Sequence, residues 1–315
     1  MITVEHLTKS YGATRAVDDL TFTIRPGAVT GFLGPNGAGK STTMRMILGL
    51  DRPSAGTALI GGKRYAELKH PLREVGALLD ATWVHPNRSA RAHLRWMAAS
   101  NAIPRQRVDE VLALVGLSEV AGKRAGGFSL GMSQRLGIAG ALLGDPGVLL
   151  FDEPVNGLDP EGIVWIRTFM QRLAGEGRTV LVSSHLLSEM ALTAEHLVVI
   201  GRGRLISEST TQQFVDSASE NTVRVRSPQL AVLRSALTER GLHLREDGPD
   251  ALLVSDASTE QIGDLAAAGG LVLHELSAQR GSLEQAFMQL TSGDVQYSTS
   301  PPSPAHARAT QEVSR

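Results

Sequence analysis

One octet constrains the fold of this chain more than any other segment: Gly-Pro-Asn-Gly-Ala-Gly-Lys-Ser at residues 34–41. It matches G-x-x-x-x-G-K-S/T at every fixed position, with an apolar run at 29–33 before it and a helical stretch at 41–50 after it. The glycines allow a tight turn that directs backbone N–H groups at one anion, and the helix adds its positive N-terminal end. The octet therefore predicts a phosphate-binding loop, with Lys40 on the β- and γ-phosphates and the Ser41 hydroxyl on Mg²⁺.

Length and composition limit the remaining possibilities. The chain has 315 residues, enough for one large domain and a smaller one, and 42% of them are hydrophobic. A net charge of −1 argues against a nucleic-acid partner. The absence of Cys excludes disulfides, Cys-ligated zinc and thiol catalysis, and it fits a reducing cytoplasm. We find no run of ~20 apolar residues and expect no secretion signal, so a solute would have to cross the membrane through another chain.

The pattern of apolar runs divides the chain into parts. Residues 1–215 alternate strand-like runs with amphipathic stretches, which predicts an α/β domain. Residues 220–292 carry shorter runs and end in a helix at 283–290, which predicts a small α+β accessory domain built as a split βαβ sandwich. Residues 293–315 are rich in Pro, Ser, Thr and Ala, which predicts a disordered tail.

Two adjacent acids end a strongly apolar strand. Val148-Leu149-Leu150-Phe151 runs directly into Asp152 and Glu153. A hard cation prefers carboxylate oxygens, so Asp152 is a candidate Mg²⁺ ligand, and Glu153 is a candidate general base for an attacking water. In isolation the pair would be a solvated strand end. The phosphate loop elsewhere in the chain favours the catalytic interpretation.

These segments and four further motifs make the chain resemble the nucleotide-binding subunits of ATP-binding-cassette (ABC) transporters over nearly all of residues 1–215. The further motifs are Lys-Ser-Tyr-Gly at 9–12, Phe-Ser-Leu-Gly-Met-Ser-Gln-Arg at 128–135, Asn-Gly-Leu-Asp at 156–159 and Ser-Ser-His at 183–185. They stand in the order of the family's adenine-stacking aromatic, signature, D-loop and switch histidine. The resemblance implies a P-loop NTPase fold with a helical signature subdomain, ATPase activity, and ATP and Mg²⁺ as cofactors.

The resemblance also implies a role for single residues. Tyr11 would stack on adenine, Glu153 would orient water, and His185 would contact the γ-phosphate. Lys40 would act on the same phosphate, and Ser41 and Asp152 would hold Mg²⁺. The residues implied to contact nucleotide in the loop are Gly34, Pro35, Asn36, Gly37, Ala38, Gly39, Lys40, Ser41 and Thr42.

Three residues are implied to act across a dimer. In the family, the positions of Ser129 and Gly131 cap the γ-phosphate of ATP bound to the opposite subunit, and the position of Asp159 lies at the same interface. The chain would therefore form a homodimer or pair with a second nucleotide-binding subunit. Taken alone, Ser-x-Gly before a helix is an N-cap, and Asp159 is a turn residue. The complete set of motifs favours the functional interpretation.

The sequence departs from the commonest family pattern in two places. The signature has Leu130 and Met132 where Gly and Gln are usual, a variant that resembles bacterial multidrug and peptide-antibiotic exporters. Asp80, assigned to the nucleotide site, stands where the family usually has a glutamine that contacts Mg²⁺ or water. Aspartate is shorter and charged, so we expect that contact to be lost or altered, which affects coupling to the membrane partner more than nucleotide binding. Trp83 lies where the family receives a helix of its permease, and ordinary loop packing is the alternative.

We therefore expect the energising subunit of an exporter of a drug, antibiotic or lipid-like compound. It would bind a transmembrane permease and lie peripherally at the cytoplasmic face of the cell membrane. An importer ATPase stays open. A soluble ABC ATPase of translation or repair is disfavoured by the single cassette and the lack of Cys, and a non-catalytic cassette by Lys40, Asp152, Glu153 and His185. The accessory domain shows no ligand-binding pattern, and its role stays open.

Overall fold

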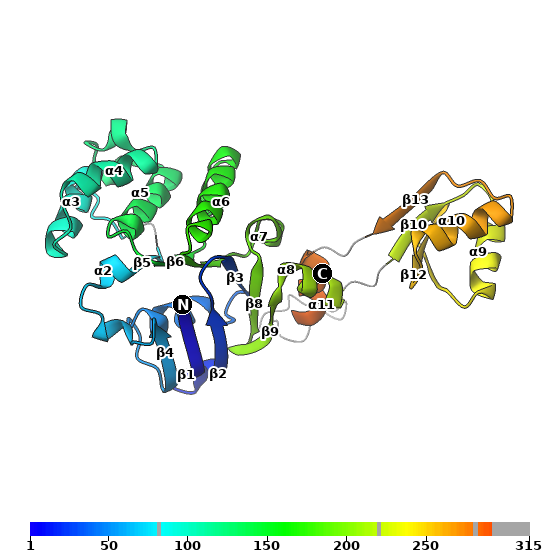
Figure 1. Ribbon diagram of the computed structural model, residues 1–315, viewed down its shortest axis with the longest axis horizontal. Coiled ribbons are helices and arrows are strands. Elements are labelled where there is room, and N and C mark those ends of the chain that lie inside the picture. Colours follow the sequence, from blue (N-terminus) through cyan, green and yellow to red (C-terminus); the bar gives the residue numbers. More distant parts are fainter. Residues whose placement is uncertain (81–82, 219–221, 280–282, 292–315) are drawn as a thin grey trace, which may run out of the picture.

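The computed structural model describes residues 1–80, 83–218, 222–279 and 283–291 (Figure 1). The predicted tail at 293–315 lies outside these residues. Among the described residues no helix combines the length and apolar content needed to cross a lipid bilayer.

A six-stranded sheet forms the centre of the first domain. Its strand order is β5-β6-β7-β3-β8-β9, parallel throughout except for β9. The strands span Val29–Leu33 (β3), Val75–Leu78 (β5), Val148–Asp152 (β6), Thr179–Ser183 (β7), His196–Gly201 (β8) and Arg204–Thr210 (β9). Every residue of β3 and β7 is buried, as expected for strands covered on both faces. Because the carboxyl ends of parallel strands share one edge, β3, β6 and β7 bring their following loops together there.

A second, antiparallel sheet covers one side of this core. Its order is β2-β1-β4, with strands Ile2–Tyr11 (β1), Thr14–Ile24 (β2) and Ala55–Ile60 (β4). Phe22 of β2 packs on Phe32 of β3, with ring centroids 5.5 Å apart. Between the sheets lies α1, which spans Lys40–Ile47. It ends before the predicted 50 because Gly49 adopts a left-handed φ of 65°, which stops a helix.

Helices form a separate lobe beside β5 (Figure 1). Its members are α3 (Ala90–Ser100), α4 (Gln106–Leu114) and α5 (Leu130–Leu142), and the short α2 (Pro71–Glu74) packs on β5. Helix α5 lies directly on β5, since a Cβ added at Gly76 would be 2.0 Å from the Ala141 carbonyl oxygen. The remaining helices of the domain are α6 (Pro160–Gly175), α7 (Leu187–Thr193) and α8 (Thr211–Ala218).

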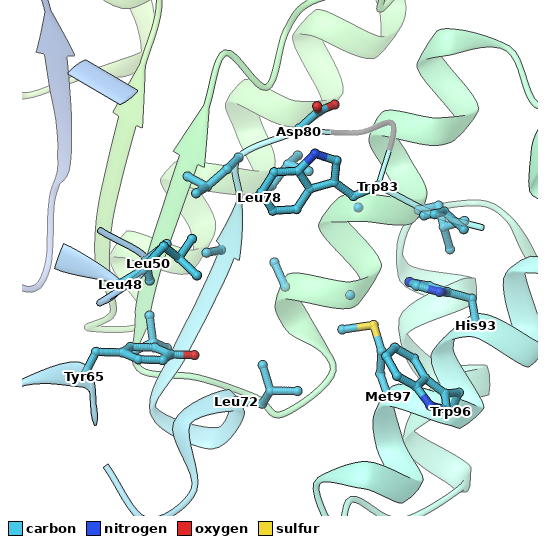
Figure 2. A pocket seen from close by; sticks show the side chains of 18 residues that line it. Leu48, Leu50, Tyr65, Leu72, Leu78, Asp80, Trp83, His93, Trp96 and Met97 are labelled. Atoms are coloured by element: carbon cyan, nitrogen blue, oxygen red, sulfur yellow. The ribbon is translucent and has the colours of Figure 1, made fainter. Parts of the chain in front are cut away.

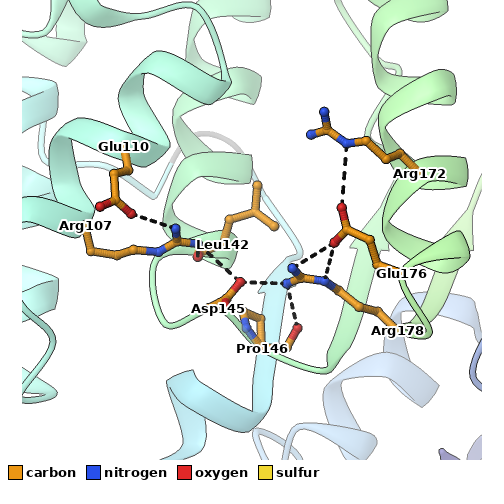
Figure 3. Close-up of polar contacts among 8 residues, drawn as sticks. All are labelled: Arg107, Glu110, Leu142, Asp145, Pro146, Arg172, Glu176 and Arg178. Carbon is orange, nitrogen blue, oxygen red and sulfur yellow. Dashed lines mark hydrogen bonds and ion pairs between the residues drawn. The ribbon is translucent and has the colours of Figure 1, made fainter.

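An ion-pair network fastens this lobe to the central sheet (Figure 3). The Asp145 carboxylate, in the turn between α5 and β6, accepts from Arg107 Nη2 at 3.3 Å and from Arg178 Nη1 at 3.0 Å. Arg107 belongs to α4 and also pairs with Glu110, whereas Arg178 precedes β7 and pairs with Glu176. One carboxylate therefore joins the helical lobe to the entry of β7.

The C-terminal sheet forms a small domain with its own core. Its order is β11-β12-β10-β13, all antiparallel, and the elements alternate as β-α-β-β-α-β. They span Thr222–Arg226 (β10), Leu230–Glu239 (α9), His243–Glu246 (β11), Ala251–Ser255 (β12), Thr259–Ala268 (α10) and Glu275–Gln279 (β13). Val223, Val225 and Leu252 of the sheet pack with Leu233 and Ile262 of the helices. This is the order expected of a split βαβ sandwich.

The last helix, α11 (Leu283–Thr291), packs elsewhere. The sequence places it in the predicted unit 220–292, but it lies against α8 and α7 of the first domain. Leu283 and Ala286 belong to the same hydrophobic cluster as Phe214 of α8. By packing, α11 thus belongs with the first domain, and β13 is the last described element of the small domain.

Candidate active site

The loop after β3 forms one wall of a polar pocket of about 330 Å³. Its conformation requires glycine at Gly39, which has a φ of 102° and where a Cβ would be 2.5 Å from the Ala16 carbonyl oxygen. The pocket brings together much of the predicted set, and its lining residues are Ala16, Asn36, Gly37, Ala38, Gly39, Lys40, Ser41, Thr42, Leu79, Asp152 and Glu153.

Lys40 is the buried cation of this pocket. Its side chain is 8% exposed, and Nζ donates to the Gly34 carbonyl oxygen at 2.6 Å and to that of Pro35 at 3.3 Å. Burial lowers the pKa of Lys40, while the carboxylates of Glu153 and Asp152 act in the opposite direction. The ammonium is therefore held inside the loop, close to both acids.

Ser183 connects the two acids, and sequence reasoning gave it no role. It lies fully buried at the end of β7, paired in register with Asp152 of β6. Its hydroxyl donates to Asp152 Oδ1 and accepts from the Glu153 backbone N–H at 3.0 Å. A hydroxyl can do both at once. The available signal was a serine next to Ser184-His185 at the end of an otherwise apolar strand.

Glu153 is fixed on three sides. It adopts a left-handed φ of 51°, which is strained for a residue with a side chain and is typical of functional sites. Its carbonyl accepts from Gln134 Nε2 at 3.1 Å, another contact that the sequence did not reveal. Its carboxylate Oε2 lies 2.7 Å from His185 Nδ1 and accepts from the His185 backbone N–H at 3.3 Å. The predicted base and the predicted switch histidine are thus in direct contact.

The predicted cross-subunit residues do not line this pocket. Ser129 is the N-cap of α5, where its hydroxyl accepts from the Met132 N–H at 3.2 Å. Asp159 is the N-cap of α6 and accepts from the Gly162 N–H at 2.9 Å. A Cβ added at Gly131 would be 3.2 Å from the Gly157 carbonyl oxygen. The signature and the 156–159 loop therefore lie side by side, outside the pocket of their own chain.

Tyr11 lies at the end of β1 with half of its surface exposed. Its hydroxyl donates to Asp51 Oδ2 at 3.0 Å, and Lys9 Nζ lies 4.9 Å from the ring centroid. Partial burial and the Asp51 contact raise the pKa of Tyr11, and a hydrogen bond with Thr42 lowers it. Tyr11 does not line the loop pocket.

Asp80 follows β5 and lines a different hollow, an apolar groove of about 320 Å³ between the sheet and the helical lobe (Figure 2). Trp83 and Trp96 stand at this groove with exposures of 63% and 55%. The Arg88 guanidinium lies 5.0 Å from the Trp96 ring centroid. The other labelled residues of the groove in Figure 2 are Leu48, Leu50, Tyr65, Leu72, Leu78, His93 and Met97.

The pocket offers oxygen donors that suit Mg²⁺. The Ser41 hydroxyl and the Asp152 carboxylate line the same wall, and hard cations prefer such ligands. The described residues contain no group of three or more His, Asp or Glu side chains able to hold a metal by themselves. This donor set fits Mg²⁺ that shares its coordination with phosphate oxygens and water, as is usual for that ion.

Comparisons with known proteins agree with this geometry. Residues 17–156 match the family described as ABC transporter, and residues 221–284 match a domain of unknown function. An uncharacterized ABC transporter ATP-binding protein of Bacillus subtilis is 36% identical over 295 residues, covering 92% of this chain and 96% of that protein. The bacitracin transport ATP-binding protein BcrA of Bacillus licheniformis is 43% identical over 211 residues, covering 66% and 69%. A solved ATP-binding subunit of an ABC transporter is 28% identical with a TM-score of 0.63, covering 69% and 92%.

Proposed function

Because this chain belongs to the family of ABC transporter ATP-binding subunits and is an ABC ATPase, we propose that it hydrolyses ATP at the loop pocket to drive export through a membrane permease. The predicted family and P-loop NTPase fold are confirmed by these similarities. The proposal also includes the roles of the single residues, Mg²⁺ as a cofactor and a permease as the partner.

The contact between Glu153 and His185 carries the hydrolytic part of the proposal. A carboxylate at the tip of β6, beside a loop built for phosphates, is placed to orient water toward the terminal phosphate. His185 holds that carboxylate at 2.7 Å and would sense the same phosphate. Mg²⁺ held by Ser41 and Asp152 would neutralise charge on the phosphate oxygens. Lys40 would move its ammonium from the loop carbonyls to the phosphates.

The signature residues support a dimer. Ser129, Gly131 and Asp159 do not line their own chain's pocket, yet Ser129 caps the start of a long helix whose N-terminus suits an anion. A second subunit facing this chain would receive that helix end at its own bound phosphate. ATP would then join the two subunits, and hydrolysis would release them. The pair would be a homodimer or two different nucleotide-binding subunits.

The apolar groove of Figure 2 suits a helix of the permease. Its exposed Trp83 and Trp96 offer large apolar contact surfaces, which are typical of interfaces. His93 Nδ1 is buried without a hydrogen-bond partner among the described residues, so a partner helix could supply one. Asp80, whose contact with Mg²⁺ or water we expected to be lost or altered, lines this groove and would contact the partner helix.

The relatives support an antibiotic as cargo. BcrA of Bacillus licheniformis is described as a bacitracin transport protein, and its matched region covers 69% of its length. We therefore propose that the permease exports a peptide antibiotic or a lipid-like compound, with this chain at the cytoplasmic face of the membrane. Import stays the alternative, because substrate choice and direction depend on the permease.

Purification of the tagged chain from membranes of its host tests the transport role. We expect a co-purifying polypeptide with several apolar spans of ~20 residues each, and faster ATP hydrolysis in its presence. Trp83→Ala should release that polypeptide, whereas Val232→Ala, a similarly exposed residue of the small domain, should retain it. Recovery of the chain from the cytosol alone, with full ATPase activity, would argue for a soluble ABC ATPase.

A further inference from the structure

The C-terminal helix α11 packs on the element that follows the switch histidine. In sequence it comes after the small domain, yet it contacts α7 and α8 (Figure 1). Leu283 and Ala286 are 2% and 1% exposed, and Phe287 packs against the same cluster, which includes Met190 of α7 and Phe214 of α8. The chain thus leaves the first domain after α8 and returns to it at α11.

Helix α7 begins directly after the segment that carries His185. His185 precedes it by two residues, and the Leu186 N–H donates to Ser184 Oγ at 3.0 Å, which ties the start of the helix to the end of β7. Met190 packs on Gly31 of β3, where an added Cβ would be 2.7 Å from its sulfur atom. A shift of α7 therefore reaches both His185 and the strand that leads into the phosphate loop.

Helix α6 also contacts α7. Glu189 of α7 pairs with Arg167 of α6 at 3.4 Å, and Gln171 Nε2 donates to the Leu192 carbonyl at 2.9 Å. These contacts come from α6, the helix that Asp159 caps. Helix α7 is thus packed by α6, by β3 and by α11. Helix α6 and strand β3 belong to the first domain's central fold, whereas α11 follows the small domain in sequence.

We propose that α11 is a positioning element for the pair formed by Glu153 and His185. By packing Phe287 against the cluster that includes α7, it fixes the start of α7 and with it the 2.7 Å contact between His185 Nδ1 and Glu153 Oε2. The inference rests on the proposed role of that pair in hydrolysis. Helix α11 would thus affect catalysis although none of its residues lines the loop pocket.

Phe287→Ala in the full chain tests this inference, with Met288→Ala as the matched control. Met288 is the next residue on the same helix, and its side chain is 70% exposed. We expect Phe287→Ala to lower kcat for ATP about tenfold, a common size for coupling through packed elements, while the Kd for ATP changes less than about twofold. Phe287→Leu should recover most of kcat. Equal losses of kcat and ATP affinity, or unchanged kcat in folded protein, would overturn the inference.

A double variant shows whether the effect passes through the histidine. If α11 acts through His185, adding Phe287→Ala to a His185→Ala protein should cause no further loss of single-turnover rate. Losses that multiply would contradict this route. Should Phe287→Ala lower the folded fraction, Phe287→Val replaces it in both backgrounds.

The ¹⁵N chemical shift of the His185 ring gives a readout that does not need activity. It is assigned by its loss in His185→Gln, and the Glu153→Ala spectrum marks the position without the carboxylate partner. We expect Phe287→Ala to move the Nδ1 signal toward that position and Met288→Ala to leave it in place. An unmoved signal refutes the inference. A wild-type chain that hydrolyses no ATP would instead refute the proposed function, and the spectrum would still decide the role of α11.

Discussion

Replacing Ser183 by alanine tests the arrangement of the two acids most sharply. The hydroxyl is fully buried, donates to the Asp152 carboxylate and accepts from the Glu153 N–H at 3.0 Å. Losing a hydrogen bond to a charged group costs about 1.5–3 kcal/mol, and a buried N–H left unpaired costs about 1–3 kcal/mol. Asp152 is only partly buried and can gain water, so we expect a total loss of about 2–4 kcal/mol. Such a loss lies below the usual stability of a domain, and the variant should fold.

Urea unfolding followed by tryptophan fluorescence measures this loss in the first domain alone. All three Trp residues, at positions 83, 96 and 165, lie in that domain, so unfolding of the small domain does not enter the signal. Ser209→Ala, a half-buried serine whose hydroxyl lies 3.4 Å from that of Ser207, is the control, and it should change stability by less than about 0.5 kcal/mol. We also expect Ser183→Ala to slow ATP hydrolysis at least tenfold. Equal unfolding midpoints and equal rates for the two variants would refute the assigned role of Ser183.

Three further predictions follow from packing and charge. Gly31→Ala would place a Cβ 2.7 Å from the Met190 sulfur, so we expect a loss of about 1–3 kcal/mol in urea unfolding and slower hydrolysis, and unchanged values would contradict the tight contact. Hydrogen bonding to Arg45 lowers the pKa of Asp51 below its ordinary 3.8. The ionised Asp51 carboxylate therefore stabilises the folded protein, and this stabilisation is fully present above pH 3.8. The stability advantage of wild type over Asp51→Asn should therefore shrink as pH falls below 3.8, and an advantage that grows there would refute the pairing. Burial lowers the pKa of Lys40 below 10.5 in the folded protein. At pH values below that lowered pKa, keeping the Lys40 ammonium charged inside the loop reduces the free energy of unfolding. Wild type should thus gain stability relative to Lys40→Met as pH rises toward 10.5, and a relative loss would contradict this burial.

The sequence predicted those parts of the site that depend on local spacing. The phosphate loop needs Gly39 at its left-handed position and a strand and a helix on either side, and all of these are adjacent in the chain. Asp152 and Glu153 were predictable because acids at the tip of an apolar strand are unusual. The structure adds that both line the pocket formed by the loop. The roles of Tyr11, Ser129, Gly131 and Asp159 stay predictions until nucleotide binding is measured.

What the sequence could not predict depends on contacts between distant segments. Ser183 and Gln134 reach Glu153 from 30 and 19 residues away, and no local pattern specifies which polar side chain meets which backbone group. Asp80 lines the apolar groove because β5 places it beside the helical lobe. Helix α11 has an apolar face that is predictable from periodicity, but the domain that this face covers is decided only by three-dimensional packing.

The rate of phosphate release from ATP by Glu153→Gln, with Mg²⁺ present, tests the central claim most directly. Glutamine keeps the size of the side chain but cannot accept a proton from water, so we expect hydrolysis to fall by at least two orders of magnitude, the usual contribution of a general base. ATP affinity in calorimetry should stay close to that of wild type, as should the hydrolysis rate of Glu119→Gln, an exposed control. Wild-type protein that binds no ATP with Mg²⁺, or a Glu153→Gln protein that hydrolyses it at the wild-type rate, would contradict the account.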